Sequence, residues 1–387
     1  MTTINVIRKH TVRVRPGLKF QFDYWMMLVL AALLVLGMLI VYSATFDLGL
    51  QAKGDSLYYI KRQFGAMVLG LMGIFVIMQF DYHALRRISV PFLGLTLVGL
   101  LLVLFFGEAI FGARRGIFGG SYQPSELAKL ATFLYIAHWL SSKGTRIKNL
   151  TYGLIPFSVI TAGVSALIVL QPDLSTAGLV TLVSFTLFFI AGADWRQFTL
   201  AGLLGGAFFF LLINTLPHAA ARVDEYKLTL EDPSQAGWQV KQAIAALGQG
   251  GVFGVGLGES TQKFEALPAA HTDGIFAILG EELGFVGGIL CIGLLGMLIW
   301  RGILAAQRAR DGFGGLLALG ITSWMAYQAL INLAVITAVM PFTGIPLPFI
   351  SYGGSSLLIS LLGMGILLNI SRDAAITQRA QPSRKKD

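Results

Sequence analysis

A polar segment at residues 250–285 interrupts a chain in which 55% of the residues are hydrophobic. Ionisable groups beside a bilayer cost free energy, so they are usually retained for recognition or catalysis. Burial at such a boundary would raise the pKa of Asp273 towards the range that a general base needs. The segment therefore predicts a proton-transfer site with Asp273 as its catalytic residue.

Helix geometry separates Asp273 from the two glutamates that follow it. A helix beginning near Asp273 places Glu281 ~12 Å further along its axis and Glu282 on roughly the opposite face. The ~5 Å carboxylate pair of a retaining glycosidase cannot come from this helix alone. We therefore expect His271, Glu281 and Glu282 to support Asp273, with the glutamates pairing with Arg or Lys from a neighbouring segment. Helix capping by Asp273 with Thr272 is the structural alternative.

A second polar constellation runs from residue 112 to residue 130. Pro124 suits the first turn of a helix, with Gln123 as its cap. Glu126 and Lys129 then share a helix face, so they are expected to form an ion pair. This charged pair either marks only a helix start or contributes to a substrate site, because charges within membranes are commonly functional.

Arg114 and Arg115 precede that helix on the predicted outer side of the membrane, where basic residues are poor topological anchors. Their guanidinium groups offer forked donors that suit a phosphate group, so both are predicted to bind substrate. The turn at Gln171 and Asp173 is a further substrate-binding candidate. For Asp173 we favour helix capping over catalysis, and the two roles are compatible.

A broken segment lies at residues 340–356, where three prolines forbid a continuous helix: Pro341, Pro346 and Pro348. Irregular backbone at membrane depth is tolerated only inside protein or beside a water-filled cavity, so a substrate cavity near Ser351 and Gly353 is expected. Gln328 and Asn332 lie four residues apart on one face of the preceding span. They either line that cavity or form interhelical hydrogen bonds.

Composition places these residues in an all-α polytopic membrane protein. Mean hydropathy is +0.71 and 13% of the residues are charged, which excludes a soluble enzyme. About ten transmembrane helices are predicted, with a long outer loop, residues 217–273, between spans 7 and 8; an amphipathic helix is expected within that loop. The predicted span cores are residues 25–44, 64–80, 90–106, 125–140, 152–170, 176–191, 198–216, 275–300, 314–340 and 349–370.

Charge sets the predicted orientation. With both termini cytoplasmic, the inner segments hold 19 of the 29 Lys and Arg residues and 6 of the 20 Asp and Glu residues. We therefore expect a cytoplasmic basic tail at 1–24, one membrane domain at 25–370 and a cytoplasmic tail at 371–387. The basic tails would rest on anionic membrane lipids, so the high pI requires no nucleic acid. Cys291 and five scattered histidines predict no metal site.

Several motifs in one order resemble the SEDS family (shape, elongation, division and sporulation), whose best-known members are RodA and FtsW. They are VYSAT, GARR, QPSELAK, QPDLSTA, GGVFGVGLGESTQK, LPAAHTD, GEELGFVG and PLPFISYGGSS. The resemblance leans towards the FtsW and SpoVE branch. The chain departs from the family pattern at Gly116, Ser175, Gln249, Ala269 and Gly274, and three of these positions, Gly116, Ala269 and Gly274, lie beside the expected site.

The resemblance implies a ten-span glycosyltransferase of the bacterial cytoplasmic membrane that polymerises lipid II at the outer face. It assigns the essential aspartate to Asp273 and cationic roles to Arg115, Lys129 and Lys263. A class B penicillin-binding protein is the implied partner. A divalent cation such as Mg²⁺ or Mn²⁺ is left open as a cofactor. Two other classes stay in view: a lipid II flippase and a scaffold without catalytic activity.

Overall fold

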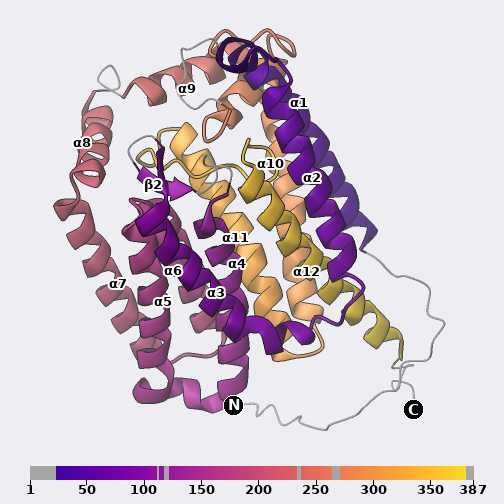
Figure 1. The fold of residues 1–387 in the computed structure, drawn as a ribbon, viewed down its shortest axis with the longest axis vertical. Helices are drawn as coiled ribbons and strands as arrows, with labels where there is room; N and C mark the ends of the chain where they lie inside the picture. The colour runs from indigo at the N-terminus through magenta and orange to yellow at the C-terminus, as the bar shows by residue number, and fades with distance from the viewer. Residues whose placement is uncertain (1–22, 111–112, 117–121, 233–236, 264–270, 381–387) are drawn as a thin grey trace.

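The computed structural model describes residues 23–110, 113–116, 122–232, 237–263 and 271–380. Long helices form one bundle, with shorter elements at both of its ends (Figure 1). In chain order the elements are α1 (Tyr24–Lys53), α2 (Tyr58–Ile77), α3 (Ala84–Phe106), β1 (Glu108–Ile110), β2 (Ala113–Gly116), α4 (Pro124–Lys143), the 3₁₀-helix η1 (Gly144–Lys148), the π-helix η2 (Leu150–Leu154), α5 (Ile155–Val169), α6 (Leu174–Ile190), α7 (Trp195–Thr215), α8 (Pro217–Glu231), α9 (Trp238–Gly250), α10 (Ile275–Arg308), α11 (Gly312–Ile336) and α12 (Gly354–Ala380).

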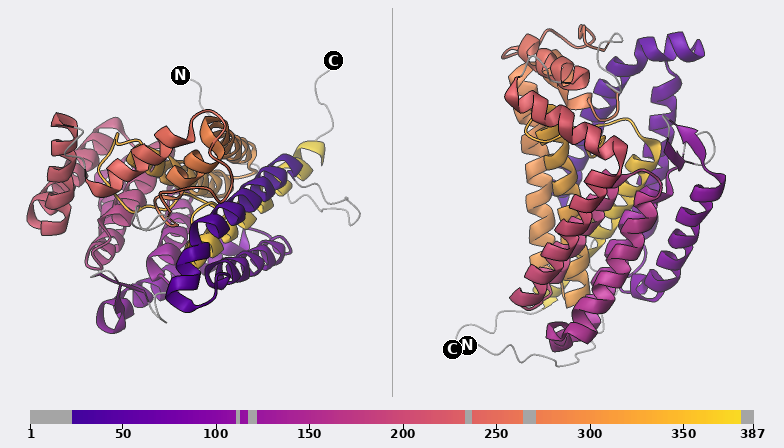
Figure 2. Two further views of the ribbon diagram at one scale, coloured as in Figure 1. Left: turned by 90° about the horizontal axis from the view of Figure 1, so that it is seen from above. Right: turned by 90° about the vertical axis from the view of Figure 1, so that its left-hand side faces the viewer.

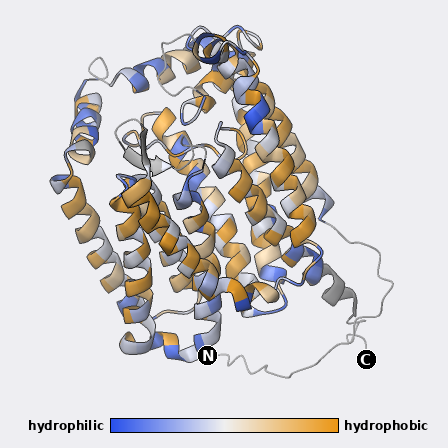
Figure 3. Cartoon of the chain, in the orientation of Figure 1, coloured by the Kyte–Doolittle hydropathy of each residue, from blue (hydrophilic) through white to orange (hydrophobic). Residues whose placement is uncertain are grey.

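The predicted all-α membrane class is confirmed. Within the described residues, eight helices are long and apolar enough to cross a bilayer. The expected ten spans also require α4, which carries charge, and α6, which has 17 residues. Both run alongside the other helices (Figure 1), and the count of ten stays a prediction. Hydrophobic residues dominate the middle of the bundle, and hydrophilic residues gather towards its ends (Figure 3). The antiparallel hairpin β1–β2 is an addition that the sequence did not predict.

An ion pair and several hydrogen bonds fix one end of the bundle. Asp23, which caps α1, accepts a hydrogen bond from Arg301 Nε on α10 at 3.0 Å. Asn369 on α12 donates to the carbonyl oxygens of Ile77 and Phe80 after α2, both at 2.7 Å. This end corresponds to the predicted cytoplasmic side. The membrane side and the three predicted chain regions stay predictions.

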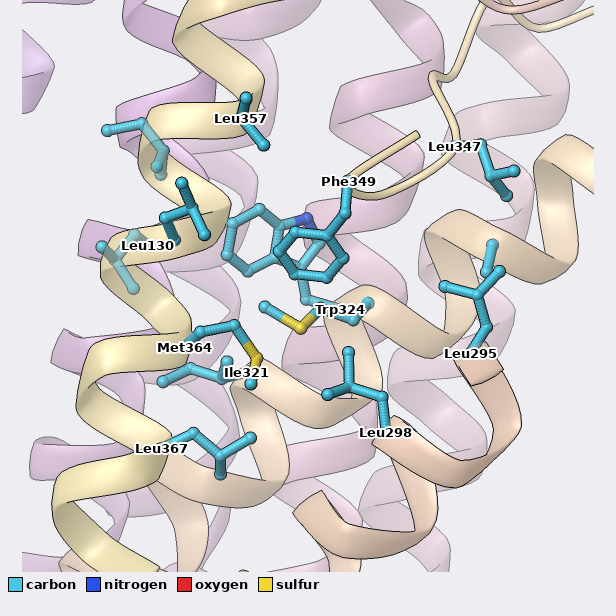
Figure 4. Close-up of a cluster of buried hydrophobic side chains, with 14 of the residues drawn as sticks. Leu130, Leu295, Leu298, Ile321, Trp324, Leu347, Phe349, Leu357, Met364 and Leu367 are labelled. Atoms are coloured by element: carbon cyan, nitrogen blue, oxygen red, sulfur yellow. The ribbon is translucent and has the colours of Figure 1, made fainter. Parts of the chain in front are cut away.

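Residues 337–353, here called the proline segment, connect α11 to α12. Leu347 and Phe349 turn into the bundle and pack with Trp324 of α11 and with leucines of α4, α10 and α12 (Figure 4). Trp324 is 0% exposed and Leu347 is 1% exposed. Close packing of these side chains in the bundle holds the irregular backbone in place.

The predicted outer loop contains two helices, α8 and α9. In Figure 1, α7 and α8 stand at the left edge and α9 lies across the top; the turned views of Figure 2 show the same helices from above and from the side. The expected helix is confirmed at α9, where Ala243, Ala246 and Gly250 are buried and Trp238 and Ile244 are exposed. Small residues let α9 approach closely, because a Cβ at Gly250 would lie 2.0 Å from the Gly280 carbonyl oxygen of α10.

Candidate active site

The proline segment is held through its backbone carbonyl groups. Gln328 Nε2 donates to the Pro346 oxygen at 2.9 Å, and Asn332 Nδ2 donates to the Ile345 oxygen at 2.8 Å. Proline residues prevent a helix here, so these carbonyl groups need donors from elsewhere. Gln328 and Asn332, expected either to line a cavity or to form hydrogen bonds, therefore act as donors that fix the broken backbone.

The other end of the proline segment is fixed by α2. Gln63 on α2, which the sequence analysis did not select, donates to the Ser351 carbonyl and accepts from Gly353 N–H, both at 3.1 Å. Ser351 Oγ accepts from Leu347 N–H at 2.7 Å. The described contacts of Ser351 and Gly353 thus shape a turn, and their predicted substrate binding stays untested.

Asp273 lies directly under this segment, in the turn that precedes α10. Its main-chain oxygen accepts from Asn332 Nδ2 at 2.8 Å, so one amide links Asp273 to the proline segment. A Cβ at Gly344 would sit 3.5 Å from Asp273 Oδ2, and Gly344 has a φ of +72° that favours glycine. Thr272 Oγ1 donates to Asp273 Oδ1 at 2.9 Å.

The carboxyl group of Asp273 is not used as a helix cap. The residue before α10 is Gly274, and no side chain forms a cap hydrogen bond there. Asp273 is 8% exposed. Burial raises its pKa above the ordinary value, while the Thr272 hydrogen bond and the charge of Arg222 act in the opposite direction. Burial and hydrogen bonding thus leave a carboxyl group whose environment suits proton transfer.

His271 lies two residues before Asp273 and is packed between tyrosine rings. Its ring centroid is 5.6 Å from that of Tyr59 and 5.5 Å from that of Tyr352. Its carbonyl oxygen accepts from Tyr352 N–H at 2.9 Å. Burial lowers the pKa of His271 to about 4, so the imidazole is neutral at physiological pH and positions the turn without adding charge.

The predicted pair of Glu126 and Lys129 on α4 is present, with Lys129 Nζ 2.8 Å from Glu126 Oε2. Both side chains are buried, and Lys129 also donates to Gln328 Oε1 at 3.4 Å and lies 5.0 Å from the centre of the Trp324 ring. The pair therefore connects α4 to the residue that holds the proline segment. Pro124 starts α4 and Gln123 occupies its cap position, both as expected, although the Gln123 side chain forms no cap hydrogen bond.

The two glutamates of α10 belong to a separate cluster at its N-terminal half. Glu281 Oε1 accepts from the backbone and hydroxyl of Thr261 at 2.8 and 3.0 Å, and its other oxygen accepts from Ser260. Glu282 Oε1 accepts from Ser43 of α1 at 2.5 Å and pairs with Lys263 Nζ at 3.4 Å. The expected pairing of a glutamate with a neighbouring cation is thus confirmed for Glu282.

The glycine-rich stretch 251–256 lies against the backbone of α10. α10 is broken at Gly284, whose φ of 68° and ψ of −166° are not helical. The freed carbonyl oxygens of Glu281 and Glu282 accept from Val255 and Gly256, and the freed N–H groups of residues 285 and 286 donate to the carbonyls of residues 251 and 252. We call residues 251–263 with 281–286 the clasp. Its glycines allow the backbone of residues 251–256 to contact the backbone of α10.

The remaining predicted substrate-binding residues are Asp173, Gln171, Arg114 and Arg115. Asp173 caps α6 by accepting from Thr176 N–H at 3.1 Å, which confirms the favoured capping role. Gln171 is fully buried and donates to the Leu100 carbonyl at 2.9 Å. Arg114 and Arg115 lie in β2, where Arg114 pairs with Ala109 across the hairpin; their side chains lie outside the described part of the structure.

Other residues near the site escaped the sequence analysis. Ser175, noted only as a departure from the family pattern, donates to the Thr343 carbonyl of the proline segment at 2.6 Å. Arg222 on α8 acts on Asp273 through its charge. These residues are far from Asp273 in sequence, so no periodic pattern relates them to it. Only the tertiary structure shows that they lie near the site. Gln249, another departure, lies outside the clasp and accepts from the hydroxyl of Thr261 in the clasp at 3.0 Å.

No group of three or more His, Cys, Asp and Glu side chains in the described residues is arranged to hold a metal ion. Near Asp273 the described neighbours are hydroxyl, amide and backbone groups. A divalent cation there would need further ligands from the substrate, because hard cations take six or more oxygen ligands.

Comparison with known proteins places this arrangement in a family. The family profile described as cell cycle protein, covering FtsW, RodA and SpoVE, matches residues 24–376. The chain is 40% identical over 361 residues to a probable peptidoglycan glycosyltransferase FtsW of Trichlorobacter lovleyi, covering 92% of this chain and 95% of the relative. It is also 40% identical over 354 residues to stage V sporulation protein E of Bacillus subtilis, covering 90% and 97%.

Solved structures agree with the sequence comparisons. A chain from a peptidoglycan synthase complex, described as coordinating polymerization and crosslinking, is similar with a TM-score of 0.74 and 30% identity, covering 91% of this chain and 98% of that one. The rod shape determining protein RodA of Thermus thermophilus gives a TM-score of 0.68 at 29% identity, covering 95% and 98%. The chain therefore belongs to the FtsW/RodA/SpoVE family of cell cycle proteins, the SEDS family, within its FtsW branch.

Proposed function

We propose that the protein is a peptidoglycan glycosyltransferase of the bacterial cytoplasmic membrane that polymerises lipid II into β-1,4 glycan. The names of its FtsW relatives support this activity. The observation that carries the chemical proposal is Asp273, a buried carboxyl group placed at the turn before α10 and under the broken proline segment. In this proposal, both termini are cytoplasmic and the site faces outward.

Asp273 acts as the general base. It accepts the proton of the sugar hydroxyl on one lipid II while that oxygen bonds to the anomeric carbon of the other. The bond from that carbon to the pyrophosphate oxygen breaks, and undecaprenyl pyrophosphate leaves with the electron pair. Attack opposite the leaving group converts an α-linked donor into a β-linked product. A positioned base typically contributes about 10²–10⁴ in rate.

The negative charge that develops on the leaving pyrophosphate must be stabilised by cations. Lys129 and Lys263 each face a buried carboxylate in this structure, at Glu126 and Glu282. The proposal therefore gives the first pyrophosphate contacts to Arg114 and Arg115, whose guanidinium groups suit phosphate oxygens. Gln171 and Asp173, at the start of α6, stay proposed substrate contacts.

The similar chain from a complex that coordinates polymerization and crosslinking supports a partner of the same kind. We propose a class B penicillin-binding protein, the transpeptidase that cross-links the new glycan. Membrane lipids surround the bundle, whose outer helices expose large apolar side chains such as Phe105 and Phe210.

The decisive experiment measures glycan formation from purified lipid II by the full-length protein, with and without the transpeptidase. Asp273→Asn should lose activity by about 10²-fold or more while remaining folded. Asp47→Asn, at the end of α1, is the matched control. Polymer made by Asp273→Asn at the wild-type rate would refute the base. Transfer of lipid II between leaflets without polymer would favour a flippase, and inactivity of the wild type in both assays would favour a scaffold.

A further inference from the structure

An ion pair and aromatic side chains mark one edge of the hydrocarbon on α1 and α10. Asp23, at the start of α1, pairs with Arg301 of α10. Tyr24, Trp25 and Trp300 lie next to this pair in sequence and are exposed. Exposed Tyr and Trp side chains gather where a membrane meets water. The ion pair therefore lies at one surface of the bilayer.

The opposite edge lies one bilayer thickness away on both helices. A hydrocarbon core of ~30 Å takes about 20 helical residues. Counted from the ion pair, this length ends close to Ser43 on α1 and close to Glu282 on α10. Those two side chains are joined by a hydrogen bond of 2.5 Å. Along both helices, the stretch between the ion pair and this hydrogen bond contains no charged residue. Two helices thus place the second edge at the same level.

Part of the clasp reaches below that second edge. Residues 251–257, here called the glycine loop, bond to α10 on both sides of its break at Gly284. A Cβ at Gly284 would lie 2.7 Å from the carbonyl carbon of Phe253. Gly284 is about 17 residues before Arg301, which corresponds to ~25 Å along the helix axis. Phe253 therefore lies ~5 Å inside the hydrocarbon.

The glycine loop turns apolar side chains outward at this depth. Its exposed apolar residues are Val252, Phe253, Val255 and Leu257. The adjoining face of α10 exposes Phe285, Val286, Ile289 and Leu290. Phe253 is 81% exposed, and residues 242–258 include no charged side chain. One apolar surface thus runs from the middle of α10 onto the glycine loop, and an exposed surface of this kind marks a contact with lipid or with another molecule.

The backbone of the glycine loop is bonded within the protein. The N–H groups of Gly254, Val255 and Gly256 donate to carbonyl oxygens of α9 and α10, and the carbonyl groups of Gly251 and Val252 accept from α10. Irregular backbone at membrane depth requires such partners, because lipid offers no hydrogen bonds. The loop therefore directs its main chain to α10 and its apolar side chains away from the protein.

We propose that the glycine loop is a re-entrant segment that inserts Phe253 among the acyl chains of the surrounding phospholipids. Lipid is the occupant because the loop lies at the depth of acyl chains and continues the exposed apolar face of a membrane-spanning helix. A stretch that the sequence analysis placed in an outer loop thus returns to the hydrocarbon. The inference goes beyond the proposed glycosyltransferase activity and does not depend on it.

The test measures the surroundings of nitroxide labels on the full-length protein in vesicles of phosphatidylethanolamine and phosphatidylglycerol. Phe253→Cys is labelled in a Cys291→Ala background. Ile289→Cys is the lipid control, and Lys227→Cys, at an exposed ion pair with Asp224, is the aqueous control. Oxygen concentrates in hydrocarbon, whereas a nickel chelate stays in water. The label at Phe253 should match that at Ile289, with high oxygen contact and low nickel contact.

Two further labels keep the test independent of how Phe253→Cys folds. Val252 is bonded to α10 four residues deeper than Gly256 is. A label at Val252→Cys should therefore lie ~6 Å deeper than a label at Leu257→Cys. Equal depths at these two positions would overturn the proposal. Nickel contact at Phe253 as high as at the aqueous control would also overturn it.

The same labels distinguish lipid from protein as the occupant. Low contact of the Phe253 label with both oxygen and nickel would mean that protein covers the glycine loop, which would overturn the proposal. The measurement is repeated with the transpeptidase bound, where oxygen contact at Phe253 should stay high. Loss of that contact on binding would make the glycine loop a partner interface and would overturn lipid as its occupant.

Discussion

The Asp273 turn and the clasp are neighbours in sequence and differ in how they use their carboxyl groups. In the clasp, both oxygens of Glu281 accept hydrogen bonds and Glu282 pairs with Lys263. At the turn, the Asp273 carboxyl accepts from Thr272 and from backbone N–H groups of its own turn, and the charge of Arg222 lowers its pKa. The clasp glutamates are therefore tied to other segments of the chain, whereas Asp273 is bonded within its own turn, where burial raises its pKa. The comparison predicts that damage to the clasp lowers stability and damage to the turn lowers activity.

The largest stability effect is expected from Lys263→Met. This change leaves Glu282 buried without its cation, which costs about 3–5 kcal/mol. Denaturation of the detergent-solubilised protein would measure the loss, and Lys227→Met, in an exposed pair, is the control. Adding Glu282→Gln should recover part of the stability. A stable Lys263→Met protein that has lost polymerisation would instead place Lys263 in the active site.

The turn that contains His271 and Asp273 should make the stability of the folded protein depend on pH. His271 has a pKa of about 4 in the folded protein against an ordinary 6.5, so the unfolded chain binds its proton first. Stability should therefore fall as pH drops from about 6.5 to about 4, by up to about 1.4 kcal/mol per pH unit from this residue. The unfolding midpoint measured across this window should depend less on pH in His271→Phe, which keeps an aromatic ring between Tyr59 and Tyr352. Equal slopes would exclude His271 as the source.

The break in α10 gives a sharper test of the clasp. A side chain at Gly284 would be strained by the positive φ, and its Cβ would lie 2.3 Å from Gly254 N. Gly284→Ala should therefore cost about 1–3 kcal/mol of stability. Gly293→Ala, on the same helix with open space around it, should gain about 0.5–1 kcal/mol. If both changes had the same effect in denaturation, the clasp would not depend on this close contact.

The smallest effect is expected at Ser175, which holds the proline segment above the turn. Ser175→Ala removes the hydrogen bond to the Thr343 carbonyl and should cost about 0.5–1.5 kcal/mol. Hydrogen exchange should become faster at the amide groups of residues 343–345 with little change elsewhere. Ser184→Ala on the same helix loses only a local bond to Val180 and is the control. Unchanged exchange in Ser175→Ala would show that other donors hold the segment.

The sequence by itself determined the helical membrane class, the α9 helix, the Glu126–Lys129 pair and the Asp173 cap. These features depend on apolar run length, helical spacing and residue type, all of which are local. It also singled out Asp273, because an acid at the edge of an apolar span is costly to retain. Its family was recognisable from motifs that occur in one order.

Tertiary structure alone decided how these residues divide between two regions. It assigned Glu281 and Glu282 to the clasp, made the glycine stretch a backbone partner for the broken helix α10, and brought Gln63 and Ser175 to the proline segment. The hydrogen bonds that hold the proline segment and the charge that acts on Asp273 come from α2, α6, α8 and α11. Such contacts depend on how helices distant in sequence pack together, and spacing along one chain does not encode that packing in a form that can be read directly.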